Sequence, residues 1–287
     1  MPDVKDIARD LLSSGAVEAV IGYEAAGPHH TRPLIARTVE EAERLVFNHS
    51  ALNNLAVYLS RQKRPGAGKV AVVAKGCDAR AIVMLIQEQQ IDRDSVFVIG
   101  VHCGGVTETM GQDWANCGAA AKCIHCTVQA PFFADAVAGE AAAYDKPADT
   151  KGARIGELAA MSAADRFAYW AAEFDRCIRC HACRQVCPMC YCEQCIADKN
   201  MPQWIETSAS LRGNTSWNII RAFHLGGRCV GCNECERACP ADIPLSLLNR
   251  TLGMTARAEF NYVAGMDPAA PTLVGTYNAS DREEYIK

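Results

Sequence analysis

One cysteine motif occurs twice in this chain of 287 residues and fixes the chemistry of its second half. The two copies read CIRCHACRQVCP, beginning at Cys177, and CVGCNECERACP, beginning at Cys229. Both follow the pattern C-x2-C-x2-C-x3-C-P, in which a tight loop presents its thiolates to a 4Fe-4S cluster. Two copies predict two clusters, so the chain is expected to carry electrons.

The fourth cysteine of each copy is set apart from the first three by the proline that follows it. In two-cluster ferredoxins this fourth cysteine ligates the cluster of the other copy, which holds the two clusters close together. We therefore assign one site to Cys177, Cys180, Cys183 and Cys239, and its neighbour to Cys229, Cys232, Cys235 and Cys187. Disulfides are disfavoured in a reducing cytosol, and zinc sites rarely show this spacing of three cysteines plus one.

The composition indicates a cytoplasmic protein without a membrane span. No run of eighteen apolar residues is present, and the amino-terminal segment MPDVKDIARD has the pattern of a polar helix instead of a signal peptide. Sixteen cysteines in such a setting argue for metal binding. A net charge of −4 provides no basic surface for nucleic acid, so another protein subunit is the expected partner.

The first half has the pattern of an α/β fold. A short helix over residues 4–12 and a buried strand over residues 17–22 are followed by a loop over residues 24–33. Thr38 and Glu41 form a capping box that opens a long helical stretch through AERLVFNHSALNNLAVYL.

A βαβ unit follows, made of a strand over residues 69–74, a turn KGCD, a helix over residues 79–90 and a strand over residues 95–101. A right-handed crossover makes the two strands parallel. Cys77 and Cys103 then both lie just past the carboxyl ends of parallel strands, at the edge where open α/β sheets bind ligands.

Four cysteines at the end of this unit have the spacing of a complete ligand set. They are Cys103, Cys117, Cys123 and Cys126. Gly104 and Gly105 would let the backbone approach a bulky cofactor closely. We expect a third 4Fe-4S cluster here, with structural zinc and unligated thiols as the alternatives.

The four remaining cysteines suggest a fourth four-thiolate site that bridges the two halves of the chain. They are Cys77 and the three cysteines of CYCEQC, namely Cys190, Cys192 and Cys195. Three soft ligands within six residues seldom occur without a metal. In the alternative reading, Cys77 is a packed thiol at a helix N-terminus and the CYCEQC thiols bind zinc together with His181.

We expect a boundary near residue 150. Residues 131–160 are rich in alanine, glycine and charge and have the composition of a linker. Residues 1–150 then form the α/β domain, mostly a parallel sheet, and residues 151–257 form a mainly helical two-cluster domain that a capping box at Ser162 opens. Residues 258–287 are expected to form an extended docking tail.

Several segments together resemble the beta subunits of coenzyme F420 hydrogenases and formate dehydrogenases. In the first half these segments are IGYE, TRPLIARTVEEAERLVFN, VAKGCDARAIVMLIQEQQI and VIGVHCGG. In the second half, CIRCHACRQVCPMCYCEQC and GRCVGCNECERACPADIPL are similar to the two-cluster modules of short bacterial relatives and of heterodisulfide-reductase-type subunits. The resemblance implies an iron-sulfur subunit of an anaerobic redox complex, with hydrogenase, formate dehydrogenase or heterodisulfide-reductase-like subunits as partners.

The flavin of that family is not expected in this chain. The larger beta subunits have a further carboxy-terminal domain that helps hold flavin, and this chain stops soon after its second cysteine motif. No G-x-G-x-x-G follows a strand. The turn at Lys75, Gly76, Asp78 and Arg80 would still be able to hold a phosphate of FAD at a helix N-terminus, and otherwise only shapes the cluster crevice.

The leading hypothesis is an iron-sulfur electron-transfer subunit that relays single electrons between a catalytic subunit and a ferredoxin, flavin or quinone-linked carrier. No catalytic residue is assigned, because the sequence contains no G-x-S-x-G, no H-E-x-x-H and no P-loop. The alternative is an FAD-containing subunit that oxidises or reduces a deazaflavin or nicotinamide cofactor and exchanges electrons with its own clusters.

Overall fold

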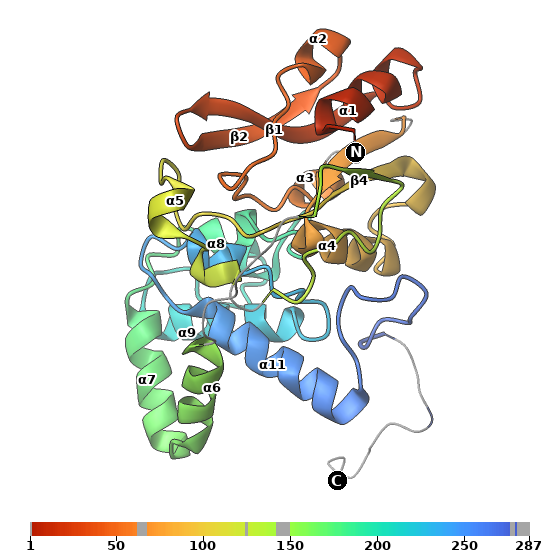
Figure 1. The fold of residues 1–287 in the computed structure, drawn as a ribbon. Coiled ribbons are helices and arrows are strands. Elements are labelled where there is room, and N and C mark those ends of the chain that lie inside the picture. Colours follow the sequence, from red (N-terminus) through yellow and green to blue (C-terminus); the bar gives the residue numbers. More distant parts are fainter. Residues whose placement is uncertain (1, 62–67, 124–125, 142–149, 276–278, 280–287) are drawn as a thin grey trace.

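The structure, a computed structural model, describes residues 2–61, 68–123, 126–141, 150–275 and 279. Within these ranges a five-stranded sheet with its helices forms one end of the molecule, and a group of helices forms the other (Figure 1). The architecture confirms the α/β class with a mainly helical second half.

The sheet has the strand order β2-β1-β3-β4-β5 in the described part of the chain. Its strands are β1 (Ala19–Gly27), β2 (His30–Ala36), β3 (Val70–Ala74), β4 (Val96–Val101) and β5 (Ala136–Ala138). All neighbouring pairs are parallel except β1 and β2. The predicted βαβ unit is confirmed, because helix α4 (Gly76–Gln87) joins the parallel strands β3 and β4.

The loop predicted over residues 24–33 is wrong, since this segment forms the β1–β2 hairpin. Glu24 faces Arg32 across the two strands, and the Arg32 guanidinium donates to the Glu24 carboxylate over 2.7 Å. Thr31 is buried and donates its hydroxyl to the carbonyl of Ser50 over 2.7 Å. Opposite charges directly across an antiparallel pair stabilise it, and the pattern of polar residues alone hid this pairing.

The long helix predicted after Thr38 is also wrong, since only α2 (Val39–Ala42) and α3 (Val57–Arg61) form there. The Thr38 cap itself is present, because its hydroxyl accepts the amide of Glu41 over 3.2 Å. Asn48 and Asn54 lie between the two helices, and each side chain accepts a backbone amide two residues later. Such local bonds offer the backbone an alternative to helix, which interrupts the predicted stretch.

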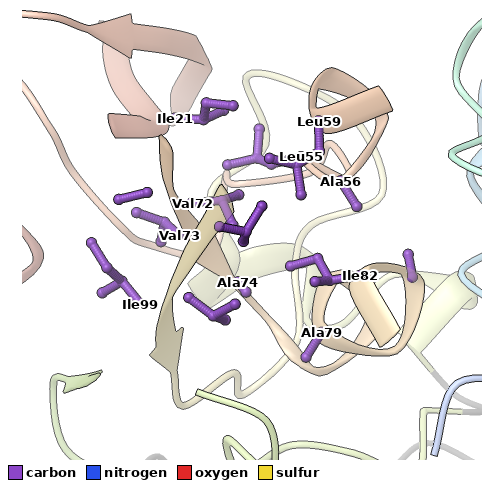
Figure 2. Packing of buried hydrophobic residues seen from close by; sticks show 14 of the residues in the cluster. Ile21, Leu55, Ala56, Leu59, Val72, Val73, Ala74, Ala79, Ile82 and Ile99 are labelled. Atoms are coloured by element: carbon purple, nitrogen blue, oxygen red, sulfur yellow. The ribbon is translucent and has the colours of Figure 1, made fainter. Parts of the chain in front are cut away.

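The central strands are buried on both faces. Val72 and Val73 of β3 and Ile99 of β4 are fully buried, and Ile82 of α4 and Leu55 pack close to them (Figure 2). Near-continuous apolar runs of this kind are typical of parallel strands with both faces covered. The packing gives the loops after β3 and β4, which carry the first predicted ligands, a rigid base.

The remaining elements of the first half are short apart from the first helix. They are α1 (Val4–Ser13), the 3-10 helix η1 (Arg93–Ser95), α5 (Trp114–Cys117) and the 3-10 helix η2 (Ala121–Cys123). The helix predicted over residues 4–12 is therefore confirmed as α1, whose N-cap is Asp3.

The second half is helical in its described residues. Its elements are α6 (Thr150–Ala160), α7 (Ala163–Asp175), α8 (Ala182–Gln185), η3 (Ile196–Asp198), α9 (Leu211–His224), α10 (Glu234–Arg237) and α11 (Leu245–Phe260). The predicted cap at Ser162 is confirmed, because its hydroxyl accepts the amide of Asp165 over 3.1 Å. α7 packs on α9, and α11 touches α6, α9 and α10.

The two cysteine motifs fold alike. Arg179 and Gly231 occupy the same position in the two motifs, and both have a positive φ, as do His181 and Asn233 two residues later. Each motif then forms a four-residue helix, α8 in the first and α10 in the second, and the two helices contact each other. The shared left-handed turns give the backbone the same local path through the first three cysteines of each motif.

Parts of the predicted linker and tail are ordered elements. The segment 131–160 contains β5, which is anchored because the Asp135 carboxylate accepts the Val98 amide over 2.7 Å, and α6. The tail predicted to start at residue 258 begins inside α11 and then returns to α4, where the Arg80 guanidinium donates to the Ala264 carbonyl over 2.7 Å. Its residues after 275, except 279, lie outside the described chain. No helix in the described ranges is long and apolar enough to cross a membrane.

Candidate metal centres

The cysteines assigned to the first site lie together. The thiol of Cys183 is within electrostatic reach of Cys177 and Cys180 from its own motif and of Cys239 from the other motif. Cys183 is buried, whereas Cys180 is exposed. A cluster held by these four thiolates would therefore have one corner at the surface.

The cysteines assigned to the second site form a similar group. Cys187, from the first motif, lies within electrostatic reach of Cys229, Cys232 and Cys235 from the second motif. Burial raises the pKa of the Cys235 thiol to about 12. A bound metal deprotonates its thiol ligands, so the thiolate at this position depends on metal binding.

Backbone amides point at the sulfur atoms of this second group. The amide of Gly231 donates to the sulfur of Cys229, and the amide of Glu234 donates to Cys232. In the first motif the amide of Met189 donates to Cys187 in the same way. Because hydrogen bonds to sulfur stabilise the charged thiolate, this donor set fits iron-sulfur clusters.

Arg221 is a buried cation of the second half. It lies on α9, 5% exposed, within electrostatic reach of Cys183, Cys187, Cys190 and Cys235. Its guanidinium donates to the Cys183 carbonyl over 3.0 Å, and its Nε has no hydrogen-bond partner among the described residues. A buried cation at this point would offset negative charge from clusters on both sides.

Four cysteines of the first half line one cavity of about 230 Å³, and they are not the four that the sequence predicts for the third site. They are Cys77, Cys103, Cys123 and Cys126. Cys77 lies in the first turn of α4, and Cys103 follows the end of β4. The crevice expected at the carboxyl ends of β3 and β4 therefore does contain both cysteines.

Cys117 lies outside this cavity. It is exposed at the end of α5, and its thiol donates to the Gly118 carbonyl over 3.5 Å. By contrast, the sulfur of Cys123 accepts the Val106 amide over 3.4 Å, and the amide of Gly105 donates to Cys103. The amide donors thus serve Cys103 and Cys123, whereas the thiol of Cys126, which also lines the cavity, donates to the Val128 carbonyl over 3.2 Å.

The same cavity reaches the second cluster site. Cys229 and Cys232 line it together with the four cysteines of the first half. Arg80 lies between the two groups, because its guanidinium is within electrostatic reach of Cys77 and Cys126 on one side and of Cys229 and Cys232 on the other. The cavity therefore connects the sheet layer with the two-cluster domain.

Two buried lysines stand next to the Cys77 thiol. Lys75 lies 2.9 Å from the carboxylate of Asp78 and also donates to the hydroxyl of Tyr23. Lys122 lies 2.5 Å from the carboxylate of Glu234 on α10, so this ion pair joins the first half to the second. Burial alone would lower the pKa of Lys122, but Glu234 raises it above its ordinary value, and the lysine stays charged.

Gly76 leaves room for the backbone that passes over α4. A Cβ atom at Gly76 would lie 1.9 Å from the carbonyl oxygen of Val128, which lies two residues after Cys126. We expect Gly76→Ala to lower the free energy of unfolding by about 1–3 kcal/mol, measured by anaerobic urea unfolding. Gly156→Ala is the matched control, since a Cβ there meets nothing within 4 Å and should be neutral or slightly stabilising. If Gly76→Ala and Gly156→Ala changed the free energy of unfolding equally, the close contact between Gly76 and Val128 would be contradicted.

The comparison with protein families identifies the second half. Residues 176–244 match the family described as a 4Fe-4S dicluster domain. The matched segment contains both cysteine motifs and α9 between them. This half of the chain contains a 4Fe-4S dicluster domain.

Curated proteins extend the similarity over most of the chain. The F420-dependent formate dehydrogenase subunit beta of Methanocaldococcus jannaschii is 24% identical over 290 residues, which cover 71% of this chain and 76% of that protein. The F420-dependent formate dehydrogenase 1 subunit beta of Methanococcus maripaludis is 23% identical over 295 residues and covers 72% and 76%. The chain is similar to these beta subunits over about seven tenths of its length.

A solved structure matches the chain over a smaller part of its length. It is a chain of the xenon-derivatised F420-reducing NiFe hydrogenase complex from Methanosarcina barkeri, which is 24% identical. The match covers 36% of the present chain and 38% of the hydrogenase chain, with a TM-score of 0.30.

The residues considered for flavin do not fit a phosphate site. The ammonium of Lys75 is bound to Asp78 and to the Asn53 carbonyl, and the guanidinium of Arg80 is bound to the Ala264 carbonyl. The Asp78 carboxylate accepts the amides of Lys75 and Leu55 and so occupies the N-terminus of α4 with negative charge. Lys75, Gly76 and Arg80 line the first cavity instead, and Asp78 is buried beside Lys75.

The predicted grouping of Cys77 with the CYCEQC cysteines is not what the structure brings together. Cys190, Cys192 and Cys195 line a second cavity, of about 240 Å³, whereas Cys77 lines the first. Sequence reasoning also missed Lys122, Glu234 and Arg221 as parts of the site. Lys122 directly precedes Cys123, and Glu234 directly precedes Cys235. A charged residue next to a predicted cluster ligand could therefore have indicated these two residues from the sequence.

Proposed function

We propose that this chain is the iron-sulfur electron-transfer subunit of an oxidoreductase complex and relays single electrons between a catalytic subunit and another carrier. The observation that carries the proposal is the cavity that cysteines of both halves line. Clusters bound there would supply one-electron carriers in series, and the chain itself would make or break no substrate bond. The 4Fe-4S dicluster domain supports the two carriers of the second half.

For the third carrier we propose the ligands Cys77, Cys103, Cys123 and Cys126, with Cys77 in the place that the sequence suggests for Cys117. Their common cavity and the amide bonds to Cys103 and Cys123 support this set. The shared cavity wall at Cys229 and Cys232 supports direct exchange with the second site.

Buried positive charges lie beside each of the proposed cluster sites. Lys75 and Lys122 beside the third site, and Arg221 beside the first two sites, are buried cations that would stabilise electrons held on the clusters. Arg80 stands where the second and third sites meet. The chain would thereby lower the cost of holding negative charge in a low-dielectric interior.

The relatives support a catalytic partner that oxidises formate, because both curated relatives are named as beta subunits of F420-dependent formate dehydrogenases. A flavin in this chain is not favoured. The first cavity, of about 230 Å³, lies below the roughly 300–1,000 Å³ of small-molecule sites, and its walls carry the cysteines.

The experiment is anaerobic purification of the complex from the native host, with iron, acid-labile sulfide, flavin and copurifying polypeptides measured together. We expect at least about twelve irons per chain, from three 4Fe-4S clusters. Formate should reduce the clusters in the complex, whereas the isolated chain should be reduced by dithionite and not by formate. The reason is that the chain carries electrons without catalysing formate oxidation.

Two results would contradict the proposal. About eight irons per chain would leave the third site without a cluster. Stoichiometric flavin released from the isolated chain on denaturation would favour the alternative of a subunit that itself handles a deazaflavin or nicotinamide cofactor.

A further inference from the structure

The CYCEQC segment places three thiols around a cavity that is separate from the sites described above. Cys190, Cys192 and Cys195 all line this cavity of about 240 Å³. Trp217 and Ile220 of α9 also line it, so the thiols of one loop face one side of that helix. Three sulfur ligands that line one open space are the donor set of a soft metal centre.

A fourth donor comes from the end of α9. His224 is the last residue of this helix and lines the same cavity. His181, which the sequence suggested as the partner of these cysteines, is absent from the cavity wall and stacks edge-on against Trp217 instead. The donors that meet at the cavity are thus three cysteines and His224.

The open cavity that these donors line favours a cluster over a single ion. Thiolates and imidazoles bind zinc at about 2.0–2.3 Å, which requires them to converge on one point. In the part of the chain that the structure describes, no three histidine, cysteine, aspartate or glutamate side chains do so. A cubane holds its ligands farther apart, around a volume that an open cavity provides.

Arg221 connects this cavity to the two-cluster domain. Its guanidinium donates to the sulfur of Cys190, and it also lines the cavity. The Cys190 thiol in turn hydrogen bonds with the thiol of Cys187, a ligand assigned to the second site. The unpartnered Nε of Arg221 adds a buried donor that a sulfide of a neighbouring cluster would satisfy.

We propose that Cys190, Cys192, Cys195 and His224 bind a fourth 4Fe-4S cluster beside the second site. Cys192 and His224 are exposed, so this cluster would lie at the surface. If the proposed function holds, it would be a point where electrons enter or leave the series. The metal site itself does not depend on the electron donor, the acceptor or the third cluster.

The test compares full-length chains purified anaerobically, with iron, zinc and sulfide measured and paramagnetic resonance recorded after dithionite. The chain should contain about sixteen irons, and Cys192→Ser should lose about four of them, a quarter, while the signals of the two-cluster domain remain. Cys195→Ser should give the same loss. Glu193→Gln, in the same exposed loop, is the matched control and should lose none.

The role of His224 as a ligand is tested by a separate measurement. His224→Ala should shift the resonance and the reduction potential of the fourth cluster and leave the other signals unchanged, because a change of ligand retunes only the cluster it binds. An iron count in Cys192→Ser equal to that of the parent chain would overturn the site. One zinc per chain that Cys192→Ser removes would overturn the cluster, and unchanged spectra in His224→Ala would overturn the histidine ligand.

Failure of this proposal differs from failure of the proposed function. Loss of the fourth cluster alone leaves about twelve irons and formate-driven reduction in the complex. Loss of the proposed function would appear as absent formate-driven reduction in a complex whose iron count is intact.

Discussion

Glu234→Gln is expected to lower the free energy of unfolding by about 3–5 kcal/mol, because it removes the buried carboxylate that pairs with Lys122 and with Arg237. The Glu234 side chain is 1% exposed and that of Lys122 is 8% exposed, with 2.5 Å between their charged atoms. The pair joins η2 of the first half to α10 of the second half. Its loss should therefore loosen the contact between the halves as well as the site.

The measurement is anaerobic urea unfolding followed by far-ultraviolet circular dichroism, with iron counted before each experiment. Glu157→Gln is the matched control, since Glu157 pairs with Arg154 on the exposed surface of α6, where such pairs contribute about 0–1 kcal/mol. The double change Lys122→Met with Glu234→Met should recover part of the lost stability, because it removes the buried charges of Lys122 and Glu234 while Arg237, at the edge of the pair, still loses its partner. Equal costs for Glu234→Gln and Glu157→Gln would contradict a buried pair.

The sequence was sufficient where local spacing determines the outcome. The βαβ unit, the first helix and the cap at Ser162 follow from short apolar runs and from side chains that bond to the nearby backbone. The dicluster domain follows from the spacing of eight cysteines, because each motif curls through the same left-handed turns. These features need no information from distant parts of the chain.

The sequence was insufficient where particular side-chain contacts outweigh the pattern of composition or spacing. The β1–β2 hairpin depends on the cross-strand pair of Glu24 with Arg32, which a loop-like composition conceals. The interrupted helix after Thr38 depends on amide bonds to Asn48 and Asn54. Counting cysteines in order along the chain also favours Cys117, although the fold turns it to solvent.

Cys77→Ser is expected to lose about four irons per chain, and Cys117→Ser is expected to lose none. Cys77 lines the cavity with Cys103, Cys123 and Cys126, and two buried lysines flank its thiol. Cys117 is exposed on α5 and donates to the carbonyl of the next residue. The two substitutions are chemically identical, so the difference between them reports position alone.

Iron, acid-labile sulfide and the resonance spectrum of the reduced chain are the measurements for this pair. The signals of the two-cluster domain should persist in Cys77→Ser, because its ligands come from the second half. They should also sharpen, since the cavity brings the third site next to Cys229 and Cys232, and a neighbouring reduced cluster broadens a signal by magnetic coupling. Iron loss in Cys117→Ser together with full iron in Cys77→Ser would restore the ligand set that the spacing alone predicts.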